Sequence, residues 1–295
     1  MTRRLLTAGI LLSALPTTLR AAEDDVHRKL ARIERKSGGR MGVCAYLSGT
    51  TRPAVTYRGG ERFPMCSTFK ALLSAAVLAR VDRGRESLSR KILIRPQDLM
   101  HYSPITQPHI GTANLTLGDM CSAAVSYSDN TAANALLRVL GGPAMVTAFA
   151  RSIGDTVTRL DRWEPALNEA LPGDPRDTTT PEAMSRNLKQ LLSGDALSSA
   201  SRRTLLEWMV ANQTGDARIR AGVPKGWRVG DKTGTGSRGT LKDIALFIPP
   251  EKTPLALSSN WIGSPPPAKP GKATTPEIPR TIPGWMGPGF SRSPT

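Results

Sequence analysis

The amino-acid sequence predicts an α/β fold of the α+β type, in which helices flank an antiparallel sheet built from both ends of the chain. Three observations indicate this fold. Strand-like segments lie close to the N-terminus, helical patterns fill most of residues 67–208, and three more strand-like segments follow before residue 263. Strands from the two ends must then meet in one sheet beside a mostly helical lobe. A ligand site is expected between the sheet and this lobe.

The first 22 residues predict a cleaved export signal. Arg3 and Arg4 provide its positive start, residues 5–15 its apolar core, and Ala21 and Ala22 the small residues of a cleavage site. The arginine pair also suits the twin-arginine export route, so that route and general secretion both stay open. The mature protein is therefore expected in the periplasm or outside the cell, with a folded domain over residues 23–262.

The spacing of apolar residues predicts each element of that domain. Residues 25–37 form an amphipathic helix pattern through Val26, Leu30 and Ile33, and two glycines end it. A helix over residues 67–82 is apolar on most faces, which predicts a central, buried helix. Strands are expected over residues 41–48, 55–63, 225–234, 241–250 and 254–262.

Residues 263–295 break this pattern. This tail reads GSPPPAKPGKATTPEIPRTIPGWMGPGFSRSPT, and proline and glycine dominate it. Because proline fixes φ and lacks the backbone N–H donor, a regular helix is excluded. The sequence predicts an extended or disordered tail.

Composition narrows the classes of function. The net charge is +16, yet the basic residues are scattered with few aromatics between them, which favours a solvated surface over a nucleic-acid site. The sequence has no apolar stretch of 18 residues, so no membrane partner is expected. The three histidines form no HxH or HExxH pattern, and the spacing of Cys44, Cys66 and Cys121 suits no metal site. We expect no metal and no cofactor.

A first motif suited to nucleophilic chemistry is Ser67-Thr68-Phe69-Lys70. It places a hydroxyl and an amine three residues apart, on one face at the start of a predicted helix. A neighbouring amine lowers the cost of forming an alkoxide nucleophile. The free N–H groups of a helix N-terminus favour developing negative charge. Taken alone, the motif is explained more readily by an ordinary capping serine.

Two further motifs follow in order along the chain. Ser128-Asp129-Asn130 precedes a helical stretch, so Ser128 can relay a proton to a leaving nitrogen and Asn130 can hold a substrate amide. A helix-capping cluster would use the same residue types. Lys232-Thr233-Gly234 lies on a predicted strand. Its lysine and threonine can bind an anion, while the glycine lets a ligand lie close to the strand.

In this order the three motifs resemble those of class A β-lactamases and penicillin-binding proteins. From about residue 23 to residue 262 the chain resembles a class A serine β-lactamase. The resemblance implies hydrolysis of the β-lactam ring of penicillins or cephalosporins through an acyl-enzyme on Ser67, and hence antibiotic resistance. It also implies a monomer with a small-molecule substrate and no nucleic-acid or membrane partner.

Residues 162–177 resemble the omega loop of this family. Glu164 and Asn168 lie four residues apart, so one helical turn can bring both onto a single water molecule. Glu164 would then act as the general base for deacylation. The resemblance further implies an ion pair between Arg162 and Asp177 and a cis peptide bond before Pro165.

The resemblance assigns the remaining site residues. Backbone N–H groups of Ser67 and Thr235 would form the oxyanion hole. The substrate carboxylate would bind Lys232, Thr233 and Thr235, with Arg218 as a second cation, although Arg218 also suits an ordinary surface arginine. Tyr102 would border the site or simply pack there half-buried. The base for acylation stays open between Lys70 directly and Glu164 through water.

Two features depart from the family. The position that pairs with Cys66 in some carbapenem-hydrolysing relatives is Gly236 here, and the partner position of Cys121 is Ser74, so free thiols are expected. The tail stands where the family has a C-terminal helix on the sheet. Each buried apolar side chain stabilises a fold by about 1.5–3 kcal/mol against a total of about 5–15 kcal/mol, so we expect a less stable protein.

Three alternatives remain. A penicillin-binding D,D-peptidase shares Ser-x-x-Lys and Lys-Thr-Gly, but it has no need of a deacylating water on Glu164 and Asn168. A destabilised, inactive relative follows if the altered tail weakens the fold. A basic nucleic-acid-binding module explains the charge but none of the motifs.

Overall fold

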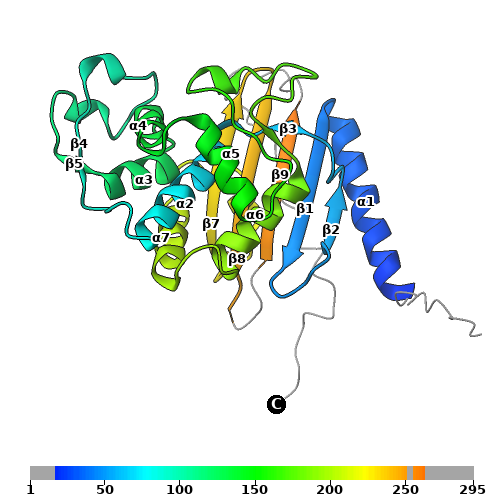
Figure 1. Cartoon of the computed structure of the whole chain (residues 1–295). Helices are drawn as coiled ribbons and strands as arrows, with labels where there is room; N and C mark the ends of the chain where they lie inside the picture. The colour runs from blue at the N-terminus through cyan, green and yellow to red at the C-terminus, as the bar shows by residue number, and fades with distance from the viewer. Residues whose placement is uncertain (1–16, 251–254, 263–295) are drawn as a thin grey trace, which may run out of the picture.

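The computed structural model describes residues 17–250 and 255–262. A five-stranded sheet forms the middle of the fold, with a lobe of helices packed on one face and helix α1 on the other (Figure 1). The helices are α1 (Thr17–Ser37), α2 (Phe69–Asp82), α3 (Leu117–Ser126), α4 (Asn130–Leu140), α5 (Pro143–Ser152), α6 (Pro181–Ser193) and α7 (Ser199–Val210). The 3-10 turns are η1 (Cys66–Thr68), η2 (Pro96–Asp98), η3 (Gln107–His109), η4 (Ala166–Asn168) and η5 (Ile219–Gly222).

The central sheet joins the two ends of the described chain, as the sequence predicts. Its strand order is β2-β1-β9-β8-β7, and every neighbouring pair is antiparallel. β1 pairs with β9 from Arg40 opposite Ile262 to Leu47 opposite Leu255. The strands are β1 (Arg40–Leu47), β2 (Val55–Tyr57), β7 (Arg228–Gly236), β8 (Thr240–Ile248) and β9 (Leu255–Ile262).

One expected strand is wrong in part. The stretch over residues 55–63 was predicted as a single strand, but β2 ends at Tyr57 and Arg58 takes a positive φ of 48°. The chain turns there through two glycines. It then forms β3 (Phe63–Pro64), which pairs in a separate small sheet with β6 (Thr178–Thr179). A second small sheet pairs β4 (Lys91–Ile92) with β5 (Leu115–Thr116).

Helix α2 lies at the centre of the larger core. Its residues from Phe69 to Ala79 are all buried, which agrees with the apolar pattern on most of its faces. Helices α3, α4, α5 and α7 pack around it, and α6 and α7 contact the sheet. Residues 66–68, however, form the 3-10 turn η1, so the α-helix itself begins at Phe69 rather than at Ser67.

Helix α1 lies on the opposite face, beside β1 and β2 (Figure 1). Its apolar side chains Val26, Leu30 and Ile33 belong to a second core on this face. Glu34 fastens its end to the sheet by accepting hydrogen bonds from Met41 N at 2.8 Å and Tyr57 Oη at 2.6 Å. The helix begins at Thr17, earlier than the predicted residue 25.

Some expectations fall wholly or partly outside the described residues. The predicted export signal covers residues 1–22, of which 1–16 are outside and the rest belong to α1. The tail, residues 263–295, is also outside. In the part of the chain that the structure describes, no single helix is long and apolar enough to cross a membrane, although the bent pair α4–α5 meets the length and composition criteria jointly.

The three cysteines are free and buried, as was expected for Cys66 and Cys121. Burial raises the pKa of each thiol to about 12, so none has the thiolate character of a reactive cysteine. The Cys66 sulfur lies 2.6 Å from the point where a Cβ on Gly236 would stand. This closeness fits the position at which some relatives carry a partner cysteine.

Candidate active site

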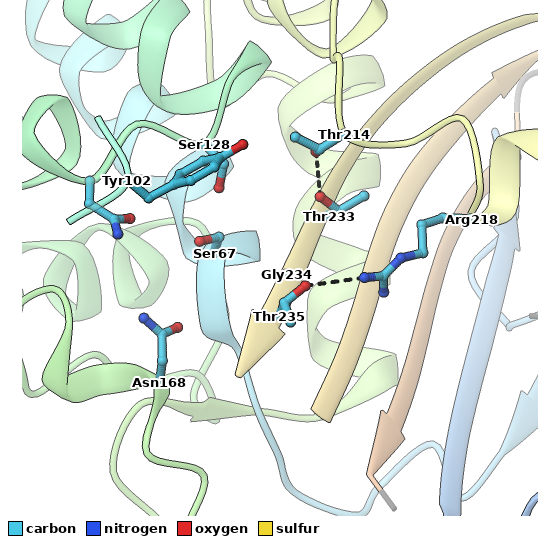
Figure 2. Close-up of a pocket in the computed structure, with 10 residues that line it drawn as sticks. Ser67, Tyr102, Ser128, Asn168, Thr214, Arg218, Thr233, Gly234 and Thr235 are labelled. Atoms are coloured by element: carbon cyan, nitrogen blue, oxygen red, sulfur yellow. Dashed lines mark hydrogen bonds between the residues drawn. The ribbon is translucent and has the colours of Figure 1, made fainter. Parts of the chain in front are cut away.

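A cavity of about 410 Å³ opens between the end of strand β7 and the helical lobe (Figure 2). Ser67 faces it from η1, Asn168 points into it from η4, and Arg218 approaches from beyond β7. All three motifs and the omega-loop segment contribute to its lining. The lining residues are Ser67, Tyr102, Ser128, Asn130, Asn168, Thr214, Arg218, Thr233, Gly234 and Thr235.

Ser67 is held in place by backbone strain and close packing. The residue before it, Cys66, has a φ of 46°, a left-handed conformation that a side chain with a Cβ disfavours. Strand β7 runs directly alongside. A Cβ added to Gly234 would lie 3.0 Å from Met65 O and 3.1 Å from Ser67 N. Only glycine at position 234 lets β7 approach the nucleophile this closely.

Lys70 is wholly buried among polar groups of the site. Its Nζ donates to Ser128 O at 2.8 Å and to Asn130 Oδ1 at 2.6 Å, and it lies 3.1 Å from Glu164 Oε1. Among the described residues no hydrogen bond joins Lys70 to Ser67. Burial lowers the pKa of Lys70, and the Glu164 carboxylate partly opposes this effect.

Lys232 approaches Ser128 from the sheet. Its Nζ donates to Ser128 Oγ at 3.2 Å and to Thr233 O at 2.8 Å. Burial and the positive charge of Lys70 lower the pKa of Lys232 to about 7. Ser128 thus lies between two buried lysines, and it has a positive φ of 62°. A hydroxyl in this position is well placed to receive and pass on a proton.

Glu164 is the centre of a polar group beneath the cavity. Its side chain is fully buried, and its Oε2 accepts from Asn168 Nδ2 at 2.5 Å. Its backbone is fixed by Asn134, which donates to Glu164 O at 3.0 Å and accepts from Glu164 N at 3.1 Å. Its Oε1 contacts only the Lys70 ammonium, and Asn168 Oδ1 is buried without a hydrogen-bond donor from the described chain.

The segment that carries Glu164 is closed by an ion pair. Arg162 Nε donates to Asp177 Oδ2 at 2.5 Å, and the other oxygen of Asp177 accepts from the backbone N–H of residues 161 and 162. Arg162 also binds Glu169 at 2.7 Å. The peptide bond between Glu164 and Pro165 is cis. The structure therefore brings together the four residues that the sequence assigned to this loop.

The far wall of the cavity is formed by hydroxyls and one guanidinium. Thr233 and Thr235 lie on β7, and Arg218 Nη2 donates to Thr235 Oγ1 at 3.1 Å (Figure 2). Arg218 is only 9% exposed, and burial lowers its pKa. It is therefore no ordinary surface arginine. Tyr102, with φ 62°, is 52% exposed and borders the opening.

Sequence reasoning missed two residues of this site. Thr214 lines the cavity and hydrogen-bonds through its hydroxyl to Thr233, but no motif pointed to it. Asn134, which fixes Glu164, could have been found because it follows Asn130 by four residues and shares its helix face. In the described ranges, no group of three or more His, Cys, Asp or Glu could hold a metal ion.

Comparisons with known proteins agree with this geometry. The profile of the β-lactamase enzyme family matches residues 25–283. The chain is 48% identical over 261 residues to β-lactamase CTX-M-25 of Escherichia coli, covering 88% of each protein. It is 47% identical over 253 residues to β-lactamase OXY-2 of Klebsiella oxytoca, covering 86% of this chain and 87% of that one.

Solved structures show the same likeness. An ancestral class A β-lactamase of Gram-negative bacteria superimposes with a TM-score of 0.80 at 59% identity, covering 82% of this chain and 93% of that one. A putative class A β-lactamase from Rhodopseudomonas palustris gives 0.79 at 53% identity, covering 81% and 91%. Sequence, fold and site agree, and the chain belongs to the β-lactamase enzyme family as a class A serine β-lactamase.

Proposed function

We propose that this enzyme opens the β-lactam ring by forming an acyl-enzyme on Ser67 and then hydrolysing it with a water held by Glu164 and Asn168. The position of Ser67 supports the first step. It lines the cavity at the start of the central helix, beside the backbone of β7. In this arrangement the N–H groups of Ser67 and Thr235 bind the developing oxyanion. One such donor typically contributes about 2.7–4 kcal/mol to the transition state.

The substrate is held by its carboxylate and its amide. Thr233, Thr235 and Arg218 offer hydroxyls and a guanidinium to the carboxylate at one end of the cavity, and Lys232 adds its charge from beneath. Asn130 lies at the other end, where its amide nitrogen donates to His101 O at 2.9 Å. This side chain can meet the substrate amide while its oxygen remains on Lys70.

Two routes can carry the proton away from Ser67. Lys70 can take it directly, because burial lowers its pKa and favours the neutral amine. Glu164 can instead take it through a water molecule, with its carboxylate held in place by Asn168 and Lys70. In either route Ser128 then delivers a proton to the departing lactam nitrogen. Its hydroxyl is in contact with Lys232, and its carbonyl oxygen accepts a hydrogen bond from Lys70.

One observation carries the proposal of a hydrolase rather than a penicillin-binding D,D-peptidase. Glu164 and Asn168 bind each other at 2.5 Å, which leaves Glu164 Oε1 with only its ion-pair contact to Lys70 and Asn168 Oδ1 without a donor from the described residues. Two adjacent acceptors of this kind suit a water that donates both its protons. A carboxylate at this distance then acts as its general base for deacylation. An enzyme that stays acylated needs no such pair.

The test is turnover of a chromogenic cephalosporin by the purified mature protein, beside a Ser67→Ala variant. Repeated turnover that the variant lacks supports the proposal. A single stoichiometric burst followed by silence indicates a penicillin-binding protein, and no reaction from a folded sample contradicts β-lactam chemistry altogether.

We further propose that export to the periplasm or the medium makes this activity protective. Bacteria expressing the full chain should then tolerate more penicillin than bacteria expressing Ser67→Ala.

A further inference from the structure

Asp243 lies outside the cavity and has no part in the chemistry described above. It belongs to β8, directly opposite Thr233 of β7, and its side chain is wholly buried. Its Oδ2 accepts a hydrogen bond from Ile219 N at 3.0 Å. Its Oδ1 is buried without a hydrogen-bond partner from the described residues. A buried carboxyl with one oxygen left without a hydrogen bond lowers the stability of the folded protein. This cost suggests that the residue has a role other than stabilising the fold.

Its one hydrogen bond falls on the residue next to Arg218. Ile219 begins the short turn η5, and Arg218 is the residue that precedes it. Arg218 N donates to Gly215 O at 2.9 Å, so the backbone of Arg218 is held on one side by Gly215 and on the other by Asp243. With the backbone fixed, the guanidinium extends to Thr235 and into the cavity (Figure 2).

The electrostatic surroundings of Arg218 also link it to Asp243. Nη2 of Arg218 binds Thr235, but Nη1 is buried without a hydrogen-bond partner in the described chain. The carboxyl of Asp243 is the acidic group that favours the charged form of this arginine. Burial and the nearby carboxyl of Asp231 raise the pKa of Asp243 well above its ordinary value. Protonated or ionised, Oδ2 still accepts from Ile219 N–H.

The neighbouring buried acid, Asp231, has different hydrogen-bond partners. Asp231 of β7 accepts from Arg220 Nε at 3.0 Å through one oxygen and from Asn212 Nδ2 at 2.6 Å through the other. Both of its oxygens are therefore engaged, one by Arg220, which does not line the cavity, and the other by Asn212. Asp231 thus reaches the cavity only through Asn212 and Thr214, whereas Asp243 holds the backbone beside Arg218 directly.

We propose that Asp243 is a positioning residue for substrate binding: it anchors the Arg218–Ile219 backbone to β8 and so aims the Arg218 guanidinium at the carboxylate of the β-lactam. The proposal rests on the function proposed above. It makes Asp243 a determinant of KM rather than of kcat, because it acts through a contact that substrate and transition state share.

The experiment compares Asp243→Ala and Asp243→Asn with the parent enzyme, on a penicillin and on its methyl ester. Asp243→Ala loses the acceptor, so we expect KM for the penicillin to rise about tenfold with kcat nearly unchanged, and KM for the ester to stay constant. Asp243→Asn keeps an acceptor oxygen and should restore the parent KM. In an Arg218→Ala background, adding Asp243→Ala should not raise KM for the penicillin any further.

Two controls separate positioning from general damage. Asp155→Ala removes another buried aspartate, which accepts the backbone N–H groups of Val157 and Thr158 and does not line the cavity. It should lower thermal stability and leave KM unchanged. Asp243→Leu keeps the branched shape of the side chain, at a somewhat larger volume, without the acceptor, and it replaces the alanine variant if that variant fails to fold.

An unchanged KM in Asp243→Ala, an equal change for the ester, or a full additional effect in the Arg218→Ala background would overturn the proposal. A crystal structure of Asp243→Leu gives a readout that does not depend on activity. The Arg218 guanidinium should leave Thr235 Oγ1, and finding it unmoved would also refute the proposal. Failure of the parent enzyme to react with any β-lactam would count against the proposed function alone.

Discussion

At the scale of single residues, the site depends on charges that the fold holds away from water. Lys70 and Lys232 are both wholly buried, and each lies against Ser128. Desolvation disfavours an ammonium ion, and a second ammonium nearby disfavours it further. The protonation of these lysines is therefore set by their surroundings, and activity should follow pH through them.

The pH dependence of substrate capture is predicted from Lys232. Its pKa of about 7 means that its ammonium is present below this pH and is lost as pH rises through it. Because the ammonium attracts the substrate carboxylate, kcat/KM should fall as pH rises from about 6 to about 9. Lys232→Arg stays protonated throughout and should lack this fall. A profile that is the same in both enzymes would assign the fall to another group.

At the scale of elements, strand β8 carries a lysine that the family resemblance does not explain. Lys242 is 1% exposed, and its Nζ has no hydrogen-bond partner in the described chain. It lies 4.4 Å from the centre of the Phe63 ring, on which the Arg40 guanidinium also packs at 4.1 Å. Burial lowers its pKa well below the ordinary value. The folded protein therefore disfavours the proton that the unfolded chain binds.

Replacing this lysine should stabilise the fold in a pH-dependent way. Below a pH of about 10.4 the unfolded chain holds a proton on Lys242 that the folded protein disfavours, so this lysine lowers stability as pH falls toward its folded pKa. Lys242→Met should raise the free energy of unfolding by about 1–3 kcal/mol at neutral pH. The gain should shrink near pH 10. Urea denaturation at both pH values checks this.

The matched control for that measurement is Lys225→Met. Lys225 is exposed in the turn before β7, so its replacement should change stability by less than about 0.5 kcal/mol. Equal effects from both variants would mean that Lys242 carries no special cost. A loss of stability in Lys242→Met would mean that its contact with Phe63 outweighs its burial.

At the scale of the whole molecule, much of the fold was readable from the sequence. Alternating and helical patterns marked β1, β7, β8, β9 and α2, and the strands at both ends had to share a sheet. Short elements were not readable, because β3 exists only through its pairing with β6, more than 100 residues along the chain. The start of α1 was missed for a different reason, since residues 17–22 were assigned to an export signal.

The site residues likewise fall into those that the sequence predicted and those that only the structure revealed. Motifs identified the residues near the nucleophile because their spacing is local. Thr214 and Asp243 were missed because only the folded sheet brings them to β7, and no spacing along the chain records that. The contacts of Lys70 with Ser128 and Glu164 likewise depend on three separate segments meeting.

The central claim is that Glu164 directs water to the acyl-enzyme, and mass spectrometry of a Glu164→Ala variant tests it most directly. Mixed with a penicillin, this variant should gain the mass of one opened β-lactam on Ser67 and keep it, with turnover reduced by about 10²–10⁴-fold, the usual contribution of a general base. The parent enzyme should show no lasting adduct. Rapid loss of the adduct from Glu164→Ala would contradict the mechanism.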